Sequence, residues 1–254
     1  MKTNSVIFYL LLALCSMTSC FATAEVKTDA QPISHQLWGE LLSKHVSEGG
    51  KVDYKGFQKD RAKLDEYLHL LSANHPNPDT WTKNERLAYW INAYNAFTIQ
   101  IVLDNYPLKS IKDVTSLNIA FVHSVWDIKF IKIEGEEYDL NNIEHGILRK
   151  KFEEPRIHFA IVCASVSCPN LRNEAYTADK LEEQLQQQAV AFINDPSKNQ
   201  ISASSVKISK IFTWFKGDFT KNGSLADFLN KYSKVKIEPK ARIDYLDYNW
   251  DLNE

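Results

Sequence analysis

The stretch RIHFAIVCASVSCPNL, residues 156–171, decides the fold that we predict for this chain. Its apolar run, residues 157–162, lies between Pro155 and a segment rich in serine, cysteine and proline. A short apolar run with such boundaries is typical of a buried β-strand. We therefore predict a central strand here. Loops at strand ends often carry functional side chains, and this one carries Cys163 and Cys168.

The composition is that of an ordinary globular protein. The 254 residues are 44% hydrophobic and 24% charged, with a formal net charge of −2. A chain of this length has ample residues for a core. Nucleic-acid binding usually requires a strongly basic face, so we expect no nucleic-acid partner.

The first residues have the pattern of an export signal. Lys2 precedes a nearly continuous apolar run at 6–14, and Ala22-Thr23-Ala24 is a small-x-small cleavage site. We predict a signal peptide at 1–24, a disordered segment at 25–32, and a periplasmic or secreted protein. In the alternative, Cys20 is acylated and anchors a lipoprotein, which is the only membrane contact that we expect.

The rest of the chain predicts one domain, residues 33–254, of the α+β class. A helix-rich N-terminal half is expected to pack on a small mixed sheet that holds the central strand. Helices are predicted at 33–46, 57–73, 83–105, 139–151, 178–194 and 225–232, a hairpin at 127–138, and further strands at 206–209 and 242–250.

The longest predicted helix, 83–105, is apolar nearly all round between Tyr89 and Phe97, so we expect it to be buried. Thr82 and Glu85 have the spacing of a capping box at its start. Asn92 and Asn95 lie one turn apart within it. Buried amides need hydrogen-bond partners, and we favour neighbouring backbone groups. In the alternative, Asn92, Asn95 and the intervening Tyr94 line a binding site.

A later helix, starting at Asp139 or Asn141, contains Glu144, His145 and Arg149. Glu144 and His145 are adjacent, so on an α-helix they point about 100° apart and do not share a face. His145 and Arg149 do share one. A histidine here is either a solvated side chain or a general base.

Two cysteines, Cys163 and Cys168, remain after signal cleavage. In an oxidising compartment they either form a local disulfide or remain free thiols. We expect Cys163, at the strand end, to be the more buried, and Cys168 to be the more reactive.

Four motifs together resemble one family. They are WINAYNA (residues 90–96), IEHGILR (143–149), HFAIVCASVSCP (158–169) and YLDYNW (245–250). The chain from about residue 52 onward is similar to the family called domain of unknown function 547. The resemblance implies no established activity. It implies that the signature positions are Asn92, Asn95, Glu144, His145, His158 and Cys163.

The residues suggest a thiol-dependent hydrolase or transferase. Cys163 or Cys168 is the candidate nucleophile, and His145 is the candidate base. His158 is a weaker candidate, because a strand would separate it from Cys163 by roughly 16 Å on opposite faces. Glu144 is a candidate for orienting a histidine. Asn92, Asn95, Tyr94 and Arg149 are candidates for binding a small molecule or peptide.

Three alternatives remain open. The same residues suit a non-catalytic binding module of the cell envelope. The cysteines alternatively cycle between dithiol and disulfide, although C-x4-C is not the usual redox motif. A zinc site of Cys163, Cys168, His145 and His158 lacks a recognised spacing, so we predict no metal and no cofactor.

Overall fold

The structure is a computed structural model that describes residues 29–114 and 124–254. The predicted signal peptide, Cys20 and residues 25–28 lie outside the described residues. The first half contains α1 (Gln36–His45), α2 (Tyr54–Lys59), α3 (Arg61–Ser72), α4 (Lys83–Asp104), η1 (Ile111–Asp113), η2 (Val125–Asp127), β1 (Ile131–Ile133) and β2 (Glu136–Tyr138). The second half contains η3 (Asn142–Leu148), α5 (Arg149–Phe152), η4 (Pro155–Phe159), α6 (Leu181–Ile193), β3 (Gln200–Ile201), β4 (Ser205–Ile208), α7 (Ile211–Trp214), α8 (Lys216–Phe219), α9 (Leu225–Leu229) and β5 (Arg242–Tyr245).

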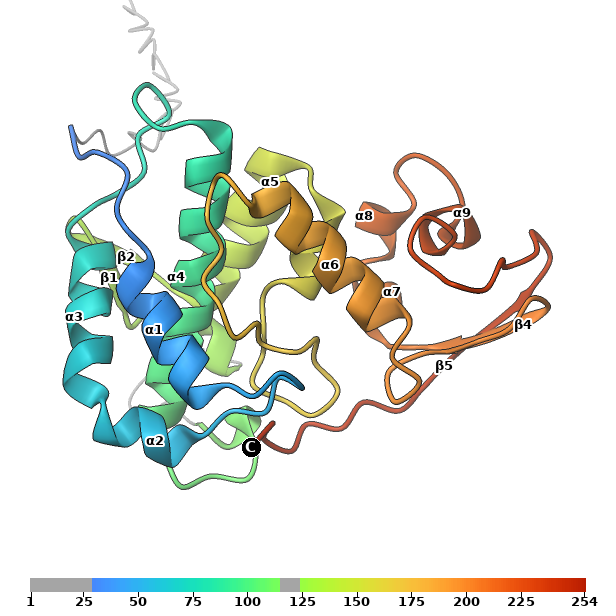
Figure 1. Ribbon diagram of the computed structural model, residues 1–254, viewed down its shortest axis with the longest axis horizontal. Coiled ribbons are helices and arrows are strands. Elements are labelled where there is room, and N and C mark those ends of the chain that lie inside the picture. The colour runs from blue at the N-terminus through green and yellow to red at the C-terminus, as the bar shows by residue number, and fades with distance from the viewer. Residues whose placement is uncertain (1–28, 115–123) are drawn as a thin grey trace, which may run out of the picture.

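The fold is α+β in a single domain with two contiguous cores, which confirms the predicted class. The first core lies among α1–α4, the β1–β2 hairpin and the segment up to α6. The second lies among α6, α7–α9 and the mixed sheet, in which β4 pairs antiparallel with β3 and parallel with β5. Figure 1 shows α1–α4 at one end of the molecule and β4, β5 and α9 at the other.

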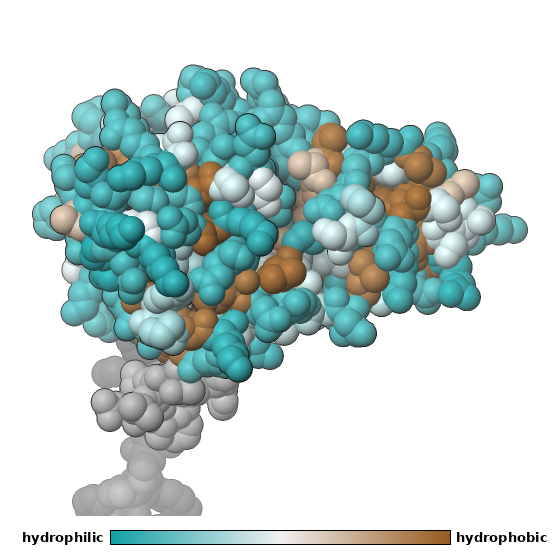
Figure 2. Space-filling view, turned by 60° about the horizontal axis from the view of Figure 1, so that its bottom comes forward, coloured by the Kyte–Doolittle hydropathy of each residue, from teal (hydrophilic) through white to brown (hydrophobic). Residues whose placement is uncertain are grey.

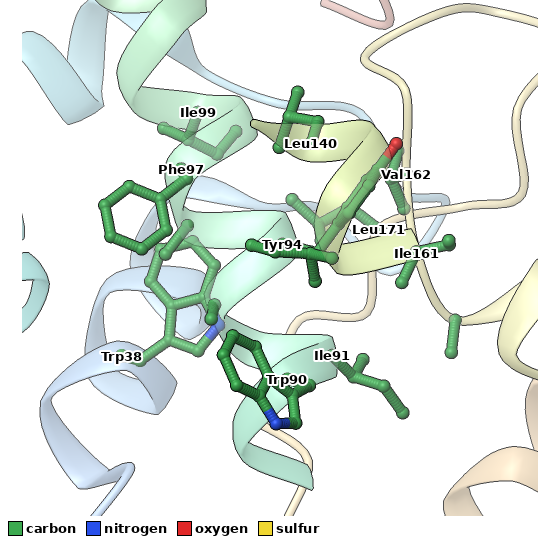
Figure 3. Close-up of a cluster of buried hydrophobic side chains, with 14 of the residues drawn as sticks. Trp38, Trp90, Ile91, Tyr94, Phe97, Ile99, Leu140, Ile161, Val162 and Leu171 are labelled. Carbon is green, nitrogen blue, oxygen red and sulfur yellow. The ribbon is translucent and has the colours of Figure 1, made fainter. Parts of the chain in front are cut away.

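Helix α4 is the centre of the first core. The Thr82 hydroxyl accepts the Glu85 amide at 3.2 Å, and the Glu85 carboxylate accepts the Thr82 amide at 2.7 Å, which confirms the capping box. Residues 87–99 are all buried. Figure 3 shows α4 side chains packed between Trp38 of α1 on one side and Ile161, Val162 and Leu171 on the other.

The predicted central strand is wrong. Residues 155–159 form the 3₁₀-helix η4, and the following residues are irregular and join neither sheet. Amide side chains satisfy the buried backbone instead of a neighbouring strand. The Asn95 amide donates to Ala160 O and accepts from Val162 N, both at 2.9 Å. A short buried apolar run is equally compatible with either arrangement, because burial alone decides its composition.

A second amide of α4 holds the chain further on. The Asn92 side chain donates to Tyr176 O at 2.8 Å and accepts from Tyr176 N at 3.0 Å. Both asparagines therefore bind neighbouring backbone, and each fixes part of the 160–176 segment against α4. Gln188 of α6 supports the same segment by donating to the carbonyls of Phe159 and Asn170.

The surface is mostly hydrophilic on the face shown in Figure 2, with small, separate hydrophobic patches. Within the part of the chain that the structure describes, no helix is both long enough and apolar enough to cross a membrane.

Replacing Asn92 with leucine should lower the free energy of unfolding, although leucine is the better helix former. The substitution leaves the amide and carbonyl of Tyr176 buried without partners, at about 1–3 kcal/mol for each group. Urea unfolding measures the change. Asn84→Leu, at an exposed position of the same helix, is the control and should cost much less. A stability equal to that of the parent would show that the Tyr176 hydrogen bonds contribute nothing.

Candidate functional site

A cavity of about 190 Å³ lies between the two cores. Its polar lining comes from Asn141, which precedes η3, from Glu144 and His145 of η3, and from His158 of η4. The half-cystine pair Cys163 and Cys168 also borders it. The rest of the wall is apolar and aromatic, namely Tyr94, Trp126, Ile161, Pro169, Ile211, Trp214, Phe215, Tyr248 and Trp250. This combination of convergent polar groups and an apolar wall is typical of ligand sites.

A larger and more open hollow, about 880 Å³, lies beside α1. Its histidine, His35, is bonded to the Tyr67 hydroxyl at 2.7 Å and faces no acidic partner. Among its other titratable lining residues, Glu40 and Lys44 are exposed. The smaller cavity brings several buried titratable groups into mutual contact, so we take it as the candidate site.

The helix η3 is a stretch of π-helix, in which the Arg149 amide donates to Glu144 O, five residues back. The wider π turn reduces the angle between consecutive side chains. Glu144 and His145 consequently both line the cavity, and the prediction that they do not share a face is wrong. Inserted π turns are frequent at functional sites.

Arg149 fixes the protonation of His145. Its guanidinium donates to His145 Nδ1 at 3.0 Å and, through two nitrogens, to both oxygens of Asp218 at 2.6 and 3.0 Å. Arginine has no acceptor, so Nδ1 of His145 carries the lone pair and the imidazole is the neutral Nε2–H tautomer. Burial, and then the charge of Arg149, lower the pKa of His145. His145 is therefore neutral near pH 7.

His158 lies between two carboxyl groups. Its Nε2 donates to Asp218 at 2.7 Å, and its Nδ1 faces Glu144 Oε1 at 3.7 Å. Nδ1 is buried and has no hydrogen-bond partner among the described residues. The ring stacks on Phe215 with centroids 3.9 Å apart. The hydrogen bond from His158, with that from Arg149, lowers the pKa of Asp218, whereas burial lowers the pKa of His158.

Glu144 has the opposite shift. Burial raises the pKa of its carboxyl group to about 7, against the attraction of Arg149 and a hydrogen bond with Tyr94. Asp218 already neutralises Arg149, so an ionised Glu144 has no full counter-charge. The site therefore holds a carboxyl group that is half protonated near neutral pH next to a neutral imidazole.

Cys163 and Cys168 form a disulfide. The Tyr248 hydroxyl lies 3.3 Å from each sulfur. Cys163 is partly exposed and Cys168 only 2% exposed, so the prediction that Cys163 is the more buried is wrong. Cys163 does not end a strand, and it opens onto the cavity. In this state neither sulfur is a nucleophile or a thiolate ligand, and no group of three or more metal-binding side chains occurs among residues 29–114 and 124–254.

The C-terminal segment completes the site. Val166 N donates to Asp251 O at 2.8 Å, Asn249 N donates to the Ser167 hydroxyl at 2.8 Å, and Ser165 pairs with Leu252. This pairing brings Tyr248 and Trp250 to the cavity wall. In Figure 1 the last segment runs from β5 back across the molecule to the C-terminus near α2.

All five predicted catalytic residues line the cavity: Cys163, Cys168, His145, Glu144 and His158. Of the predicted binding residues, Tyr94 also lines it, and Arg149 lies behind His145. Asn92 and Asn95 bond to backbone instead. The 16 Å separation expected for His158 and Cys163 required a strand, and without the strand both residues border one cavity.

Sequence reasoning missed Asp218 and the aromatic residues as parts of a site. Asp218 lies in KGDF, which carries no recognisable motif. Trp214 and Phe215 follow Phe212 in an aromatic run that is typical of a core, but Trp214 is exposed and Phe215 partly exposed, whereas Phe212 is buried. The C-terminal motif YLDYNW was a usable signal, because two of its rings reach the cavity.

Comparison with known proteins identifies the family. The family model described as "Protein of unknown function, DUF547" matches residues 78–193. Residues 78–193 belong to this family. Neither a curated protein nor a solved structure matches this DUF547 chain. The matched range contains Glu144, His145, His158 and both cysteines, whereas Asp218 and most of the aromatic wall lie beyond it.

Glu144 should make this DUF547 protein less stable as the pH rises. The folded pKa, about 7, exceeds the reference value of 4.5, so the folded state binds the proton more tightly than the unfolded state. Below pH 4.5 the carboxyl group is protonated in both the folded and the unfolded state, so it costs the folded state no free energy. Between pH 4.5 and 7 its ionisation lowers the free energy of unfolding, by about 3 kcal/mol at most.

Urea unfolding of the parent and of Glu144→Gln at pH 4, 5.5 and 7.5 measures this effect. The glutamine variant should gain stability relative to the parent as the pH rises. The comparison also cancels the opposite contribution of His145 and His158, which have lowered pKa values in the folded state. A pH-independent difference would contradict the raised pKa of Glu144.

The disulfide should protect both cysteines in the native protein. Intact mass should be two hydrogens below that of the dithiol, and iodoacetamide should add nothing before reduction. After reduction without unfolding, Cys163 should be alkylated faster than Cys168, because it is the more exposed sulfur. Faster labelling of Cys168, measured by peptide mass, would contradict this order.

Proposed function

We propose that the cavity is the active site of an enzyme that uses Glu144 as general acid and His158 as general base, in a hydrolytic or group-transfer reaction. Nδ1 of His158 carries a lone pair that no hydrogen bond among the described residues occupies. A group transfers protons best when its pKa lies near the working pH. The observation that carries the proposal is the contact of a buried carboxyl group of raised pKa with neutral imidazoles in one cavity.

The charges behind the site support these roles. Asp218 is held ionised by His158 and Arg149, so it fixes the ring of His158 and keeps Arg149 from neutralising Glu144. Arg149 in turn leaves the Nε2 hydrogen of His145 on the other side of the ring. Because Arg149 occupies its Nδ1 lone pair, His145 donates a hydrogen bond to the ligand through Nε2, and Nδ1 of His158 accepts the proton that the nucleophile releases.

Activity should follow a bell-shaped pH dependence. Glu144 acts as an acid only while protonated, so kcat/KM should fall above about pH 7. His158 acts as a base only while neutral, so kcat/KM should also fall below its lowered pKa. The fall at high pH should disappear when Glu144 is replaced, and the fall at low pH should disappear when the base is replaced.

A panel of nitrophenyl esters, glycosides and phosphates, with nitroanilides, tests the proposal on the disulfide-bonded protein. Glu144→Gln and His158→Gln should each lower the kcat of any hydrolysed substrate by about 10²–10⁴-fold. Glu136→Gln and His69→Ala are controls at exposed positions and should leave it unchanged. Turnover that survives both site variants would contradict the proposal, and ligand binding without turnover would favour a binding module.

A thiol-dependent enzyme or dithiol redox protein is the second candidate, favoured by the position of both sulfurs at the same cavity. Reduction would expose the Cys163 thiol beside the Tyr248 hydroxyl. Adding a reductant separates the two candidates. Acid–base activity should persist in the oxidised protein and in Cys163→Ser, whereas thiol chemistry should appear only after reduction and be absent from that variant. The disulfide also supports the proposal that the protein is exported to an oxidising compartment.

A further inference from the structure

One wall of the cavity is a continuous array of aromatic rings. Trp126, Trp214, Tyr248 and Trp250 all line the cavity and contact one another with ring centroids 4.6–5.8 Å apart. Trp214 is 46% exposed, one of the few large hydrophobic residues of the described chain on the surface. Most of the protein's other aromatic residues are buried in the two cores. An exposed tryptophan at the edge of a polar cavity indicates a surface for ligand contact.

The arrangement of the rings excludes a cage for a cation. A cage needs rings that stand apart and surround an ammonium group, whereas these rings pack directly on one another. Lys112 Nζ already lies 5.0 Å from the centre of the Trp250 ring. Trp214, the exposed ring of the wall, is the one available to a flat ligand.

The opposite side of the cavity is suited to hydroxyl groups. It carries the Glu144 carboxyl group and the imidazole of His145. Glu144 exchanges hydrogen bonds as donor or acceptor, and neutral His145 donates one through Nε2. Arg149, which would suit a phosphate or carboxylate, is already engaged by Asp218 and His145. A cationic or phosphorylated ligand is disfavoured by this balance.

We propose that the cavity binds one pyranose ring of a carbohydrate, stacked on the wall of Trp214, Tyr248 and Trp250, with its hydroxyls on Glu144 and His145. The axial C–H groups of a pyranose form an apolar face that suits the negative face of an aromatic ring. A volume of about 190 Å³ accommodates one such ring. A longer glycan would extend out of the cavity across the exposed Trp214. This inference rests on the proposed function only in that both concern the same cavity.

Isothermal titration of the disulfide-bonded protein with the methyl glycosides of glucose, galactose, mannose and N-acetylglucosamine tests the proposal. At least one should bind saturably and change the tryptophan fluorescence. Sorbitol, which has the hydroxyls but no ring, should not bind. Trp214→Ala should weaken binding at least tenfold, and Trp214→Phe should retain part of it. Val235→Ala, which removes another exposed hydrophobic side chain remote from this cavity, should leave binding unchanged.

Failure of all four glycosides to bind would overturn the proposal, as would binding that Trp214→Ala does not alter. Phenol and tetramethylammonium are the competing probes, and tighter binding of either than of every glycoside would also overturn it. Glycoside binding without turnover dependent on Glu144 would overturn the proposed enzyme and leave this inference standing. Glu144-dependent turnover of an ester or phosphate, without binding of any glycoside, would support the proposed enzyme and overturn this inference.

Discussion

The side-chain amide of Asn95 is the contact on which the site depends. It replaces a β-ladder for the irregular chain at 160–162, because a single buried amide satisfies one carbonyl and one backbone N–H. Without such a partner, a non-repetitive segment in the core would carry unpaired polar groups at about 1–3 kcal/mol each. Since Asn95 lies in the buried middle of α4, it also fixes the distance of the segment from that helix. Tyr94, the preceding residue of that helix, and Cys163, which follows the segment, consequently meet at one cavity.

Charge balance explains why acidic and basic groups coexist at this depth. Asp218 is paired twice, by the forked guanidinium of Arg149 and by His158, so the buried region contains one ion pair and two neutral imidazoles. A second carboxylate would be uncompensated, and the protein accommodates Glu144 by retaining its proton up to about pH 7. Replacing buried charge by a shifted pKa is the usual outcome when no partner is available. The raised pKa of Glu144 thus follows from the pairing of Asp218 with Arg149 and His158.

Sequence reasoning located the helices and the site residues better than the connection between them. Periodicity and capping chemistry are local, so α4 with its Thr82 capping box was predictable to within one residue at its C-terminal end. Hydrophobicity reports burial but not hydrogen-bond partners, so residues 157–162 were mistaken for a strand. No particular amino-acid composition marks the π turn at Glu144. The assumption of an ordinary α-helix therefore placed His145 on another face. Asp218 is brought in by tertiary packing of α8, which no short-range pattern encodes.

Different parts of the chain supply the titratable groups and the aromatic wall of the cavity. The titratable groups Glu144, His145 and His158 lie within the range that matches the family, residues 78–193. Asp218 and most of the aromatic wall come from residues beyond it. The C-terminal segment is held to the disulfide loop by backbone pairing, Val166 with Asp251 and Ser165 with Leu252. Backbone pairing fixes position whatever side chains are attached, so the aromatic residues on this segment can vary without moving the acid and imidazoles. The fold therefore supplies the titratable groups of the cavity and most of its aromatic wall from different parts of the chain.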